Sequence, residues 1–468
     1  MAGTEDRLYP DAAERARTHD ALTRTLIDSV ARVEQGPVTP RRDVAEFGDV
    51  LAPFDFAAPR HLDEVITSTI GILERGLVHV THPRYLGLFN PSPTFPSECA
   101  DRIVSVFNPQ LATASTSPAA IAIERHIIAA VARRAGFEAH SGGHFTSGGS
   151  EANATALLCA LTRACPGFAQ NGARGFAGAP VIYVSRESHL AWIKIAHMTG
   201  IGRKAVRLVA TDGAGRMDIH ALQAAIARDR EEGREPVMIA ATAGTTGGGM
   251  IDPLEDCASI ARAEGLWFHI DAAWGGALIA SDRLRRQVQG IERADSFTLD
   301  AHKWFAASMG CGMFVTAHPD LLPAVFGVAN AFMPSGSGSV EDPYLTSIQW
   351  SRRFLGLRLF LSLACAGWGG YGELVERAVA RADQLREILV TRGWRITNES
   401  PVAVLCAEPP SRSRRTPAEI VAQVRDSGLA WISTATFEGG AVVRACITNA
   451  ETTEGDIIVV ADALEEAL

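Results

Sequence analysis

The chain has 468 residues, of which 47% are hydrophobic and 21% are charged, values that exclude a fibre or a wholly disordered protein. Its 44 basic and 53 acidic residues give a formal net charge of -9, which argues against a general nucleic-acid-binding protein. The eight cysteines contain no Cys-x-x-Cys pair, so we expect reduced thiols in a cytoplasmic protein with no metal site. No apolar run approaches the ~20 residues of a membrane helix, so we expect no membrane span.

The first third of the chain is predicted to be helical in part. Segments 12–33 and 61–77 place apolar residues three and four positions apart, and each predicts a helix. The Pro-containing stretch between them, 37–59, predicts an extended connection. The Pro-, Ser-, Asn- and Thr-rich segment 85–116 predicts loops over a site.

The middle third alternates short apolar runs with helical segments, which is typical of a mainly parallel sheet covered by helices on both faces. The predicted strands are 181–184, 206–209, 237–241, 266–270, 296–299 and 311–316, and the predicted helices are 189–199, 218–232 and 254–264. Parallel sheets of this kind bind ligands beyond the carboxyl ends of their strands, so we expect the chemistry there.

The last third begins with a Gly-, Ser- and Pro-rich segment, 328–343, which predicts a long mobile loop of the kind that covers active sites. The rest of the chain predicts a long helix, a strand at 402–406, a helix at 417–427, a strand at 441–447 and a closing helix. We therefore expect a helical arm over 1–84, a large α/β domain over 85–350 and a small α+β domain over 351–468.

Three segments carry residues suited to bind a cofactor. Thr146–Ala152 opens a helix with small residues, which leaves backbone N–H groups free to bind an anion. Asp271 ends a buried strand, where a carboxylate needs a partner that stabilises its charge. Lys303 follows another strand between His302 and Trp304, and a buried lysine becomes a competent nucleophile toward an aldehyde.

Each of these segments also has a simpler interpretation. Ser150 is interpreted as a helix N-cap after Gly-rich turn residues, Asp271 as a capped strand end, and Lys303 as a surface lysine. The three together are more specific, because an anion-binding helix start, a carboxylate and a downstream lysine are what pyridoxal 5'-phosphate requires. The carboxylate protonates the pyridine nitrogen, and the lysine holds the aldehyde as a Schiff base.

The chain at this point resembles the group II pyridoxal-phosphate-dependent decarboxylases, the family of aromatic-L-amino-acid and glutamate decarboxylases. The segments that carry the resemblance are His82–Tyr85, Thr146–Ala152, Ser188–His189, Gly244–Thr246, His269–Ala273, Asp295–Trp304 and Ser347–Phe354. The resemblance implies the fold type I architecture of aspartate aminotransferase, with a mainly parallel central sheet. It also implies a homodimer with active sites at the interface, in which the N-terminal arm helps to form the dimer.

The resemblance assigns roles to three catalytic side chains. Lys303 is similar to the Schiff-base lysine, Asp271 to the partner of the pyridine nitrogen, and His189 to the histidine that stacks on the cofactor ring.

Five more positions match the cofactor contacts of the family. Gly149 and Ser150 match phosphate contacts at the helix start, and Thr246 and Ala273 match residues that line the cofactor. His302 matches a residue beside the Schiff base and the phosphate.

Substrate contacts are less determined. Arg444 resembles a small-domain arginine near the site, and Tyr85, Leu88, Phe89 and Phe95 are candidates for an apolar pocket or for ordinary packing. Among these we take Phe89 and Arg444 as the substrate residues. Two positions keep an open role: Arg84, which suits a side-chain carboxylate or a structural contact, and Asp300, which stands where some members have Asn beside the phosphate.

One position departs from the family pattern. Many members carry a Tyr on the loop before the Arg-Arg-Phe motif, and this Tyr gives a proton to Cα after CO2 leaves. Phe332 takes that place here, and a phenylalanine has no proton to give. Tyr344 is an alternative donor, although it stands close to the motif at Arg352.

The leading hypothesis is a pyridoxal-phosphate-dependent carboxy-lyase that converts an L-amino acid with an aromatic or other apolar side chain to its amine and CO2. The alternative is decarboxylation-dependent oxidative deamination to an aldehyde, because Phe332 replaces the loop Tyr. A distant alternative is an inactive binding protein on the same fold. A dinucleotide-binding dehydrogenase is disfavoured because no Gly-x-Gly-x-x-Gly follows the first strand.

Overall fold

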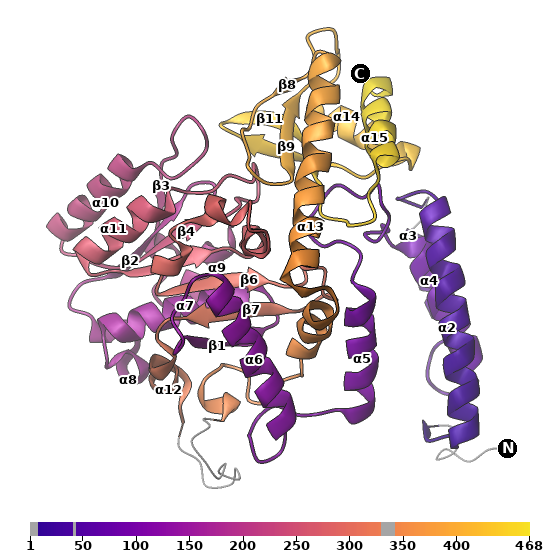
Figure 1. The fold of residues 1–468 in the computed structure, drawn as a ribbon, viewed down its shortest axis with the longest axis horizontal. Coiled ribbons are helices and arrows are strands. Elements are labelled where there is room, and N and C mark those ends of the chain that lie inside the picture. Colours follow the sequence, from indigo (N-terminus) through magenta and orange to yellow (C-terminus); the bar gives the residue numbers. More distant parts are fainter. Residues whose placement is uncertain (1–7, 41–43, 329–341) are drawn as a thin grey trace.

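The computed structural model describes residues 8–40, 44–328 and 342–468, and it contains a large and a small sheet (Figure 1). The large sheet has seven strands in the order β1-β7-β6-β5-β4-β2-β3. The strands are β1 (Gly142–Thr146), β2 (Pro180–Ser185), β3 (Val206–Val209), β4 (Glu235–Thr242), β5 (Trp267–Asp271), β6 (Ser296–Asp300) and β7 (Gly312–Thr316). Neighbours from β3 to β6 pair in parallel, whereas β7 is antiparallel to both β6 and β1. The α/β fold with a mainly parallel sheet is confirmed.

The strands form where the apolar runs predicted them, because the centre of the sheet is covered on both faces. Every residue of β2, β5, β6 and β7 is buried. A strand buried on both faces is apolar almost continuously and does not alternate. The exception is β1, which was not predicted, since its sequence Gly-Gly-His-Phe-Thr contains no apolar run.

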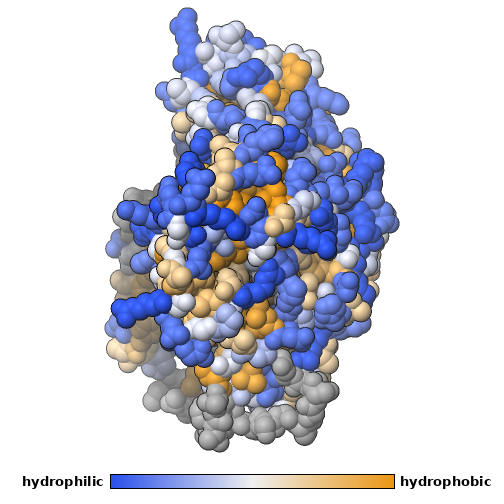
Figure 2. All heavy atoms as spheres, turned by 90° about the vertical axis from the view of Figure 1, so that its left-hand side faces the viewer, coloured by the Kyte–Doolittle hydropathy of each residue, from blue (hydrophilic) through white to orange (hydrophobic). Residues whose placement is uncertain are grey.

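Helices cover the large sheet on both sides (Figure 1). They are α6 (Pro118–Arg134), α7 (Gly149–Ala164), α8 (Phe168–Asn171), α9 (Ala191–Met198), α10 (Ile219–Glu231), α11 (Leu254–Glu264) and α12 (Leu322–Phe326). The predicted helices 189–199, 218–232 and 254–264 are thereby confirmed to within a few residues, whereas α6 was not predicted. The face on the α10 and α11 side is mostly hydrophilic with small apolar areas (Figure 2), which is ordinary for a folded protein.

Two predictions for the first third were wrong. The segment 85–116 contains the helix α5 (Phe95–Phe107), which begins where Thr94 accepts a hydrogen bond from the amide of Ser97. A Pro in the first helical turn is favourable, so the Pro-rich start marks a helix and not a loop. The stretch 37–59 contains the short helix α3 (Val44–Leu51) and is not extended throughout.

The small sheet lies near the C-terminus. Its order is β10-β11-β9-β8, all antiparallel, with β8 (Arg395–Ile396), β9 (Val404–Glu408), β10 (Ser433–Phe437) and β11 (Gly440–Cys446). The helices α14 (Pro417–Ser427) and α15 (Glu454–Glu466) belong to the same region. The long helix α13 (Gly356–Thr391) reaches from this region to the large sheet (Figure 1) and is interrupted at Gly367, whose φ is 64°.

The N-terminal helices α2 (Ala12–Gln35) and α4 (Leu62–Gly76) lie to one side of the body (Figure 1). Neither helix has a buried residue. They are joined by an ion pair between Arg32 and Glu74. Within the described ranges, none of the helices combines the length and apolar character that crossing a membrane requires.

Candidate active site

A cavity of about 300 Å³ opens at the carboxyl ends of the parallel strands. Nine of the residues predicted for the site line this cavity: Phe89, Gly149, Ser150, His189, Thr246, Asp271, Ala273, His302 and Lys303. The fold therefore brings together residues that lie more than 200 positions apart in the sequence.

Asp271 is the last residue of β5, and its side chain is held by two hydrogen bonds. The amide nitrogen Nδ2 of Asn153 donates to Oδ2 at 2.8 Å, and the backbone N–H of Ala273 donates to Oδ1 at 3.2 Å. Hydrogen bonds to a carboxylate favour its charged form. The interpretation of Asp271 as a capped strand end is therefore incomplete, because Asn153 reaches it from the helix α7.

Asn153 is in turn fixed by buried neighbours. Its Oδ1 accepts a 2.6 Å hydrogen bond from the hydroxyl of Thr298 and lies 3.1 Å from Nε2 of His269. Burial lowers the pKa of His269 to about 4, so its ring is neutral near pH 7. The other ring nitrogen lies 2.9 Å from the hydroxyl of Ser296. The network leaves the Asn153 amide with its Nδ2 pointing at Asp271.

The start of α7 offers the backbone amides that the predicted anion site requires. Gly148 occupies the N-cap position and has no side-chain cap, so the interpretation of Ser150 as an N-cap is wrong. Within the described part of the chain, the backbone amides of Gly149 and Ser150 have no acceptor. A Cβ added to Gly149 would stand 3.0 Å from Oδ2 of Asp300 and 3.2 Å from Cβ of Ala273, so a larger residue would require these neighbours to shift.

Glu151 fixes the turn that precedes this helix. Its Oε2 accepts hydrogen bonds from the backbone N–H of Ser147 at 2.8 Å and from the Ser147 hydroxyl at 2.7 Å. The side chain of Gln349 donates to the same carboxylate at 2.8 Å. The segment before the Arg-Arg-Phe motif is thereby tied to the anion site.

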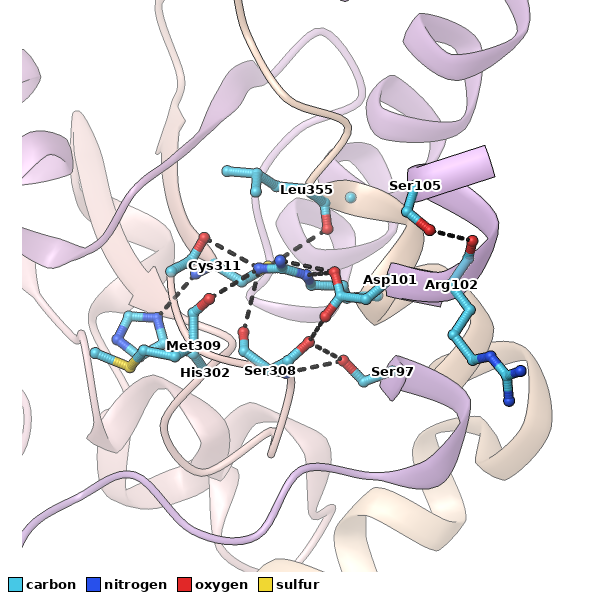
Figure 3. Close-up of polar contacts among 12 residues, drawn as sticks. Ser97, Asp101, Arg102, Ser105, His302, Ser308, Met309, Cys311 and Leu355 are labelled. Carbon is cyan, nitrogen blue, oxygen red and sulfur yellow. Dashed lines mark hydrogen bonds and ion pairs between the residues drawn. The ribbon is translucent and has the colours of Figure 1, made fainter. Parts of the chain in front are cut away.

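Lys303 lies at the floor of the cavity and is not a surface lysine. Its Nζ is 3.2 Å from Oδ2 of Asp300 and 5.6 Å from the centre of the Phe89 ring, and 23% of its side chain is exposed. His302 accepts a 3.1 Å hydrogen bond at Nδ1 from the backbone N–H of Cys311 (Figure 3). Because burial lowers the pKa of His302, the ring is neutral with its proton on Nε2.

The loop after Lys303 is held from two helices. Arg358 of α13 donates to the carbonyl oxygens of Ser308 and Met309 and forms a 2.7 Å ion pair with Asp101 of α5. The amide of Ser308 donates to the hydroxyl of Ser97 at 2.8 Å, and Figure 3 shows these groups converging. These contacts hold the loop in a position where Met309 lines the cavity and is 68% exposed.

His189 projects into the cavity from the loop after β2. The backbone N–H of Ala191 donates to its Nδ1 at 3.1 Å. When the ring is neutral, its proton is therefore on Nε2. The loop is joined to β4 by a 2.9 Å hydrogen bond between the hydroxyls of Ser188 and Thr242.

Arg444 packs against Phe89, which lines the cavity, but Arg444 itself is not among the lining residues. The Arg444 guanidinium carbon lies 4.8 Å from the centre of the Phe89 ring. Its Nε donates to the carbonyl oxygen of Gly247 at 3.1 Å, and its Nη1 donates to Gly87. Among the described residues, Nη2 of this buried arginine has no hydrogen-bond partner. The Phe89 ring also contacts Trp274 at 4.8 Å.

The other apolar candidates do not line the cavity. Tyr85 stacks on Trp431 with ring centres 5.0 Å apart, and neither Leu88 nor Phe95 lines the cavity. Arg84 takes a structural role, because it bonds to the Leu429 carbonyl and lies 3.5 Å from Asp456.

Phe332 lies outside the described residues. Tyr344 is described: its ring is 4.9 Å from the ring of Trp350, and it is not among the residues that line the cavity.

The sequence analysis missed Asn153, Glu151, Trp274 and Met309, all of which line the cavity. For Asn153 a signal existed, because an asparagine inside an apolar helix is unfavourable unless it has a partner.

The residues present fit pyridoxal 5'-phosphate. Two free amides at a helix start suit its phosphate, the anchored Asp271 suits its ring nitrogen, and Lys303 suits its aldehyde. Gly149 leaves room that a Cβ would fill.

Comparison with known proteins gives the same answer. The family described as "Pyridoxal-dependent decarboxylase conserved domain" matches residues 50–406. The L-2,4-diaminobutyrate decarboxylase of Rhizobium meliloti (strain 1021) is 30% identical over 402 residues, which cover 84% of this chain and 79% of that protein. The aromatic-L-amino-acid decarboxylase of Bacillus atrophaeus is 27% identical over 394 residues, which cover 82% of this chain and 80% of that protein.

A solved structure shares the fold. The 4-hydroxyphenylacetaldehyde synthase of Rhodiola rosea superposes with a TM-score of 0.88 at 21% identity, over 98% of each chain. The family match, together with the assembled lysine, aspartate and anion site, leads to one conclusion: the chain belongs to the group II pyridoxal-phosphate-dependent decarboxylases and is a carboxy-lyase that uses pyridoxal 5'-phosphate.

Proposed function

We propose that this enzyme removes the α-carboxyl group of an L-amino acid with an aromatic or other apolar side chain and releases the amine and CO2. The position of Phe89 carries the proposal. Its ring lies 5.6 Å from Nζ of Lys303 and 4.8 Å from the guanidinium of Arg444. An apolar ring beside the reacting lysine suits an apolar side chain, and the adjacent cation suits the α-carboxylate.

Two charged side chains support this choice, because they are already paired. Glu151 accepts hydrogen bonds from Ser147 and Gln349, which makes it a poor partner for a cationic side chain. Arg84 is engaged with Asp456 and does not line the cavity, so it offers nothing to a side-chain carboxylate.

The roles of the individual side chains follow from their geometry. Pyridoxal phosphate, when bound, supplies a ring that accepts the electron pair left on Cα when CO2 departs. Asp271 would hold the ring nitrogen protonated, and Lys303 would hold the aldehyde covalently. In its neutral form, His189 would carry its proton on Nε2. Arg444 is the candidate to meet the α-carboxylate, because its Nη2 has no partner among the described residues.

Oxidative deamination to an aldehyde is the second candidate. Phe332 has no hydroxyl proton, so another group must return a proton to Cα, and His189 is the candidate among the described lining residues. Slow protonation leaves time for oxygen to react at Cα, which yields aldehyde, ammonia and peroxide.

A homodimer with active sites at the interface is also proposed. α2 and α4 have no buried residues, yet they expose the large apolar side chains Leu26, Ile27, Val30, Leu62 and Leu73. Isolated helices are marginal in water, so these helices need an apolar partner surface. A second copy of the chain supplies it.

The test is a panel of L-amino acids, assayed separately for CO2, amine, aldehyde and peroxide. Phenylalanine, tryptophan and valine represent apolar side chains, and glutamate and 2,4-diaminobutyrate are the charged comparison. We expect CO2 and amine from the apolar members. Turnover of only the charged members would overturn the proposal, and equimolar aldehyde and peroxide would select the second candidate.

A further inference from the structure

Asp300 is a carboxylate placed against an anion site. It ends β6, is 3% exposed, and lines the same cavity as the free amides at the start of α7. A Cβ on Gly149 would stand 3.0 Å from its Oδ2, so this oxygen lies close to the first residue of that helix. In the protein without cofactor, the helix start and the Lys303 amine at 3.2 Å both stabilise the negative charge.

The second oxygen of this carboxylate is unusual. Oδ1 of Asp300 is buried and has no hydrogen-bond partner among the described residues. It lies beside Gly312, where a Cβ would come within 2.7 Å of it and within 2.6 Å of the Thr146 hydroxyl. That hydroxyl already donates to the carbonyl oxygen of Gly148. A buried carboxylate oxygen without a hydrogen-bond donor is costly in free energy, unless a ligand supplies the hydrogen bond or the oxygen itself is protonated.

A phosphate at this helix start meets a like charge. Two anions in contact repel each other strongly where water is excluded, and one proton shared between their oxygens converts that repulsion into a charge-assisted hydrogen bond. The second ionisation of a phosphate monoester lies near pH 6, so the proton is available around neutral pH.

We propose that Asp300 contacts the cofactor phosphate through a shared proton, so that binding of pyridoxal phosphate takes up one proton. On binding, one proton leaves the solvent and forms an O–H bond on Asp300 or on the phosphate. No other bond forms or breaks in this step. The proposal concerns the cofactor alone and holds for any amino-acid substrate.

The other groups that face Asp300 do not take this proton. Nε2 of His302 lies 3.8 Å from Oδ2, but burial lowers the pKa of this histidine. Cys311, which precedes Gly312, has a pKa raised to about 12 by burial, so it stays a thiol. His144 on β1 is buried with a pKa lowered to about 3. Nζ of Lys303 already pairs with Oδ2 of Asp300 at 3.2 Å.

Charged groups farther along these elements are engaged elsewhere. Glu151 of α7 is bonded to Ser147 and Gln349, and Asp271 of β5 is bonded to Asn153. Arg358 of α13 is paired with Asp101, and Glu124 of α6 with Arg352.

The test is a calorimetric titration of the full-length chain, freed of cofactor, in buffers with different ionisation enthalpies. Pyridoxal phosphate is the ligand, and pyridoxal is the matched ligand that keeps the aldehyde but lacks the phosphate. We expect the wild type to take up about one proton more with pyridoxal phosphate than with pyridoxal, and Asp300→Asn to take up no more. Asp282→Asn, which changes a carboxylate that is 84% exposed and does not line the cavity, keeps the wild-type difference.

A second measurement needs no variant. Above the pH of the coupled ionisation, the Kd of the wild type for pyridoxal phosphate rises about tenfold per pH unit, relative to its Kd for pyridoxal. Equal proton uptake in the wild type and Asp300→Asn, or a Kd ratio that does not change with pH, would overturn the proposal.

Discussion

Asn153 on α7 donates a 2.8 Å hydrogen bond to Asp271 on β5, across 118 positions of sequence. This bond links the helix whose start is proposed to bind the phosphate to the carboxylate that is proposed to bind the ring nitrogen. In that proposal, one helix would position both ends of the cofactor.

Replacing Asn153 by Leu removes a donor from a buried carboxylate. An unpaired buried acceptor of this kind costs about 1–3 kcal/mol, so we expect the Kd for pyridoxal phosphate to rise by roughly 5- to 150-fold. Fluorescence titration of the cofactor-free protein with pyridoxal phosphate measures this Kd. Asn153→Asp, which places a second carboxylate beside Asp271, is expected to bind the cofactor still more weakly. An unchanged Kd in both variants would show that Asp271 does not depend on this contact.

Acid stability is expected to depend on His144. Burial lowers its pKa to about 3, and neither ring nitrogen has a hydrogen-bond partner among the described residues. As pH falls below 6.5, the unfolded chain takes up a proton at this histidine and the folded chain does not. Stability therefore falls with falling pH between these two values, by about 1.4 kcal/mol per pH unit for this histidine.

Urea unfolding at several pH values measures this dependence. His82 and His269, whose pKa values burial lowers to about 4, add to it in the wild type. His144→Phe removes one of the protons that the chain takes up on unfolding. The free energy of unfolding of this variant is therefore expected to fall less steeply with falling pH. If the free energy of unfolding of the variant depended on pH as steeply as that of the wild type, His144 would not be the source of this dependence.

The buried ion pair between Glu124 and Arg352 is expected to be costly to break. The two side chains are 2% and 4% exposed and 2.6 Å apart. Glu124→Ala leaves a buried arginine unpaired, and we expect a loss of about 3–5 kcal/mol in the free energy of unfolding. Replacing both residues together, by Leu and Met, is expected to lose less.

An exposed pair provides the control for that experiment. Arg381 and Glu454 are 2.9 Å apart, but the side chain of Glu454 is 70% exposed. Breaking it by Glu454→Ala is expected to cost at most about 1 kcal/mol. Equal losses at the two sites would contradict the distinction between buried and exposed pairs.

The N-terminal arm offers a test of the proposed dimer. Ile27 and Val30 of α2 are 64% and 56% exposed. Changing both to Glu is expected to shift the protein from dimer to monomer in sedimentation experiments, because charge cannot be buried in an apolar interface. His19→Glu, on an exposed position of the same helix, is expected to leave the dimer intact. A double variant that stays dimeric would exclude the arm from the interface.

The central sheet could be predicted from the sequence because its strands are buried on both faces and read as apolar runs, as β2 and β5 do. The strand β1 could not be predicted, because its sequence has no strand pattern of its own. Gly142, Gly143 and His144 form a strand through their pairing with β7. The helix α5 was missed because a Pro and two Ser or Thr residues at its start resemble a loop, although they cap the helix.

The residues of the candidate site also include some that the sequence could predict and some that it could not. Lys303, Asp271 and Gly149 stand in compact motifs whose chemistry is local, so the sequence identified them. Asn153 and Met309 act through contacts that exist only after folding: one reaches Asp271 across the sheet, and the other lies on a loop that Arg358 holds. No spacing rule within one segment reveals such contacts.

The chain has three lysines, Lys194, Lys204 and Lys303, and both Lys194 and Lys204 are exposed. Borohydride reduction of the holoenzyme, followed by proteolysis and mass spectrometry, identifies the lysine that holds the cofactor. The account predicts a reduced pyridoxyl group on the peptide that contains Lys303, and none on the peptides that contain Lys194 or Lys204. A label on either of those lysines, or no label at all, would contradict it.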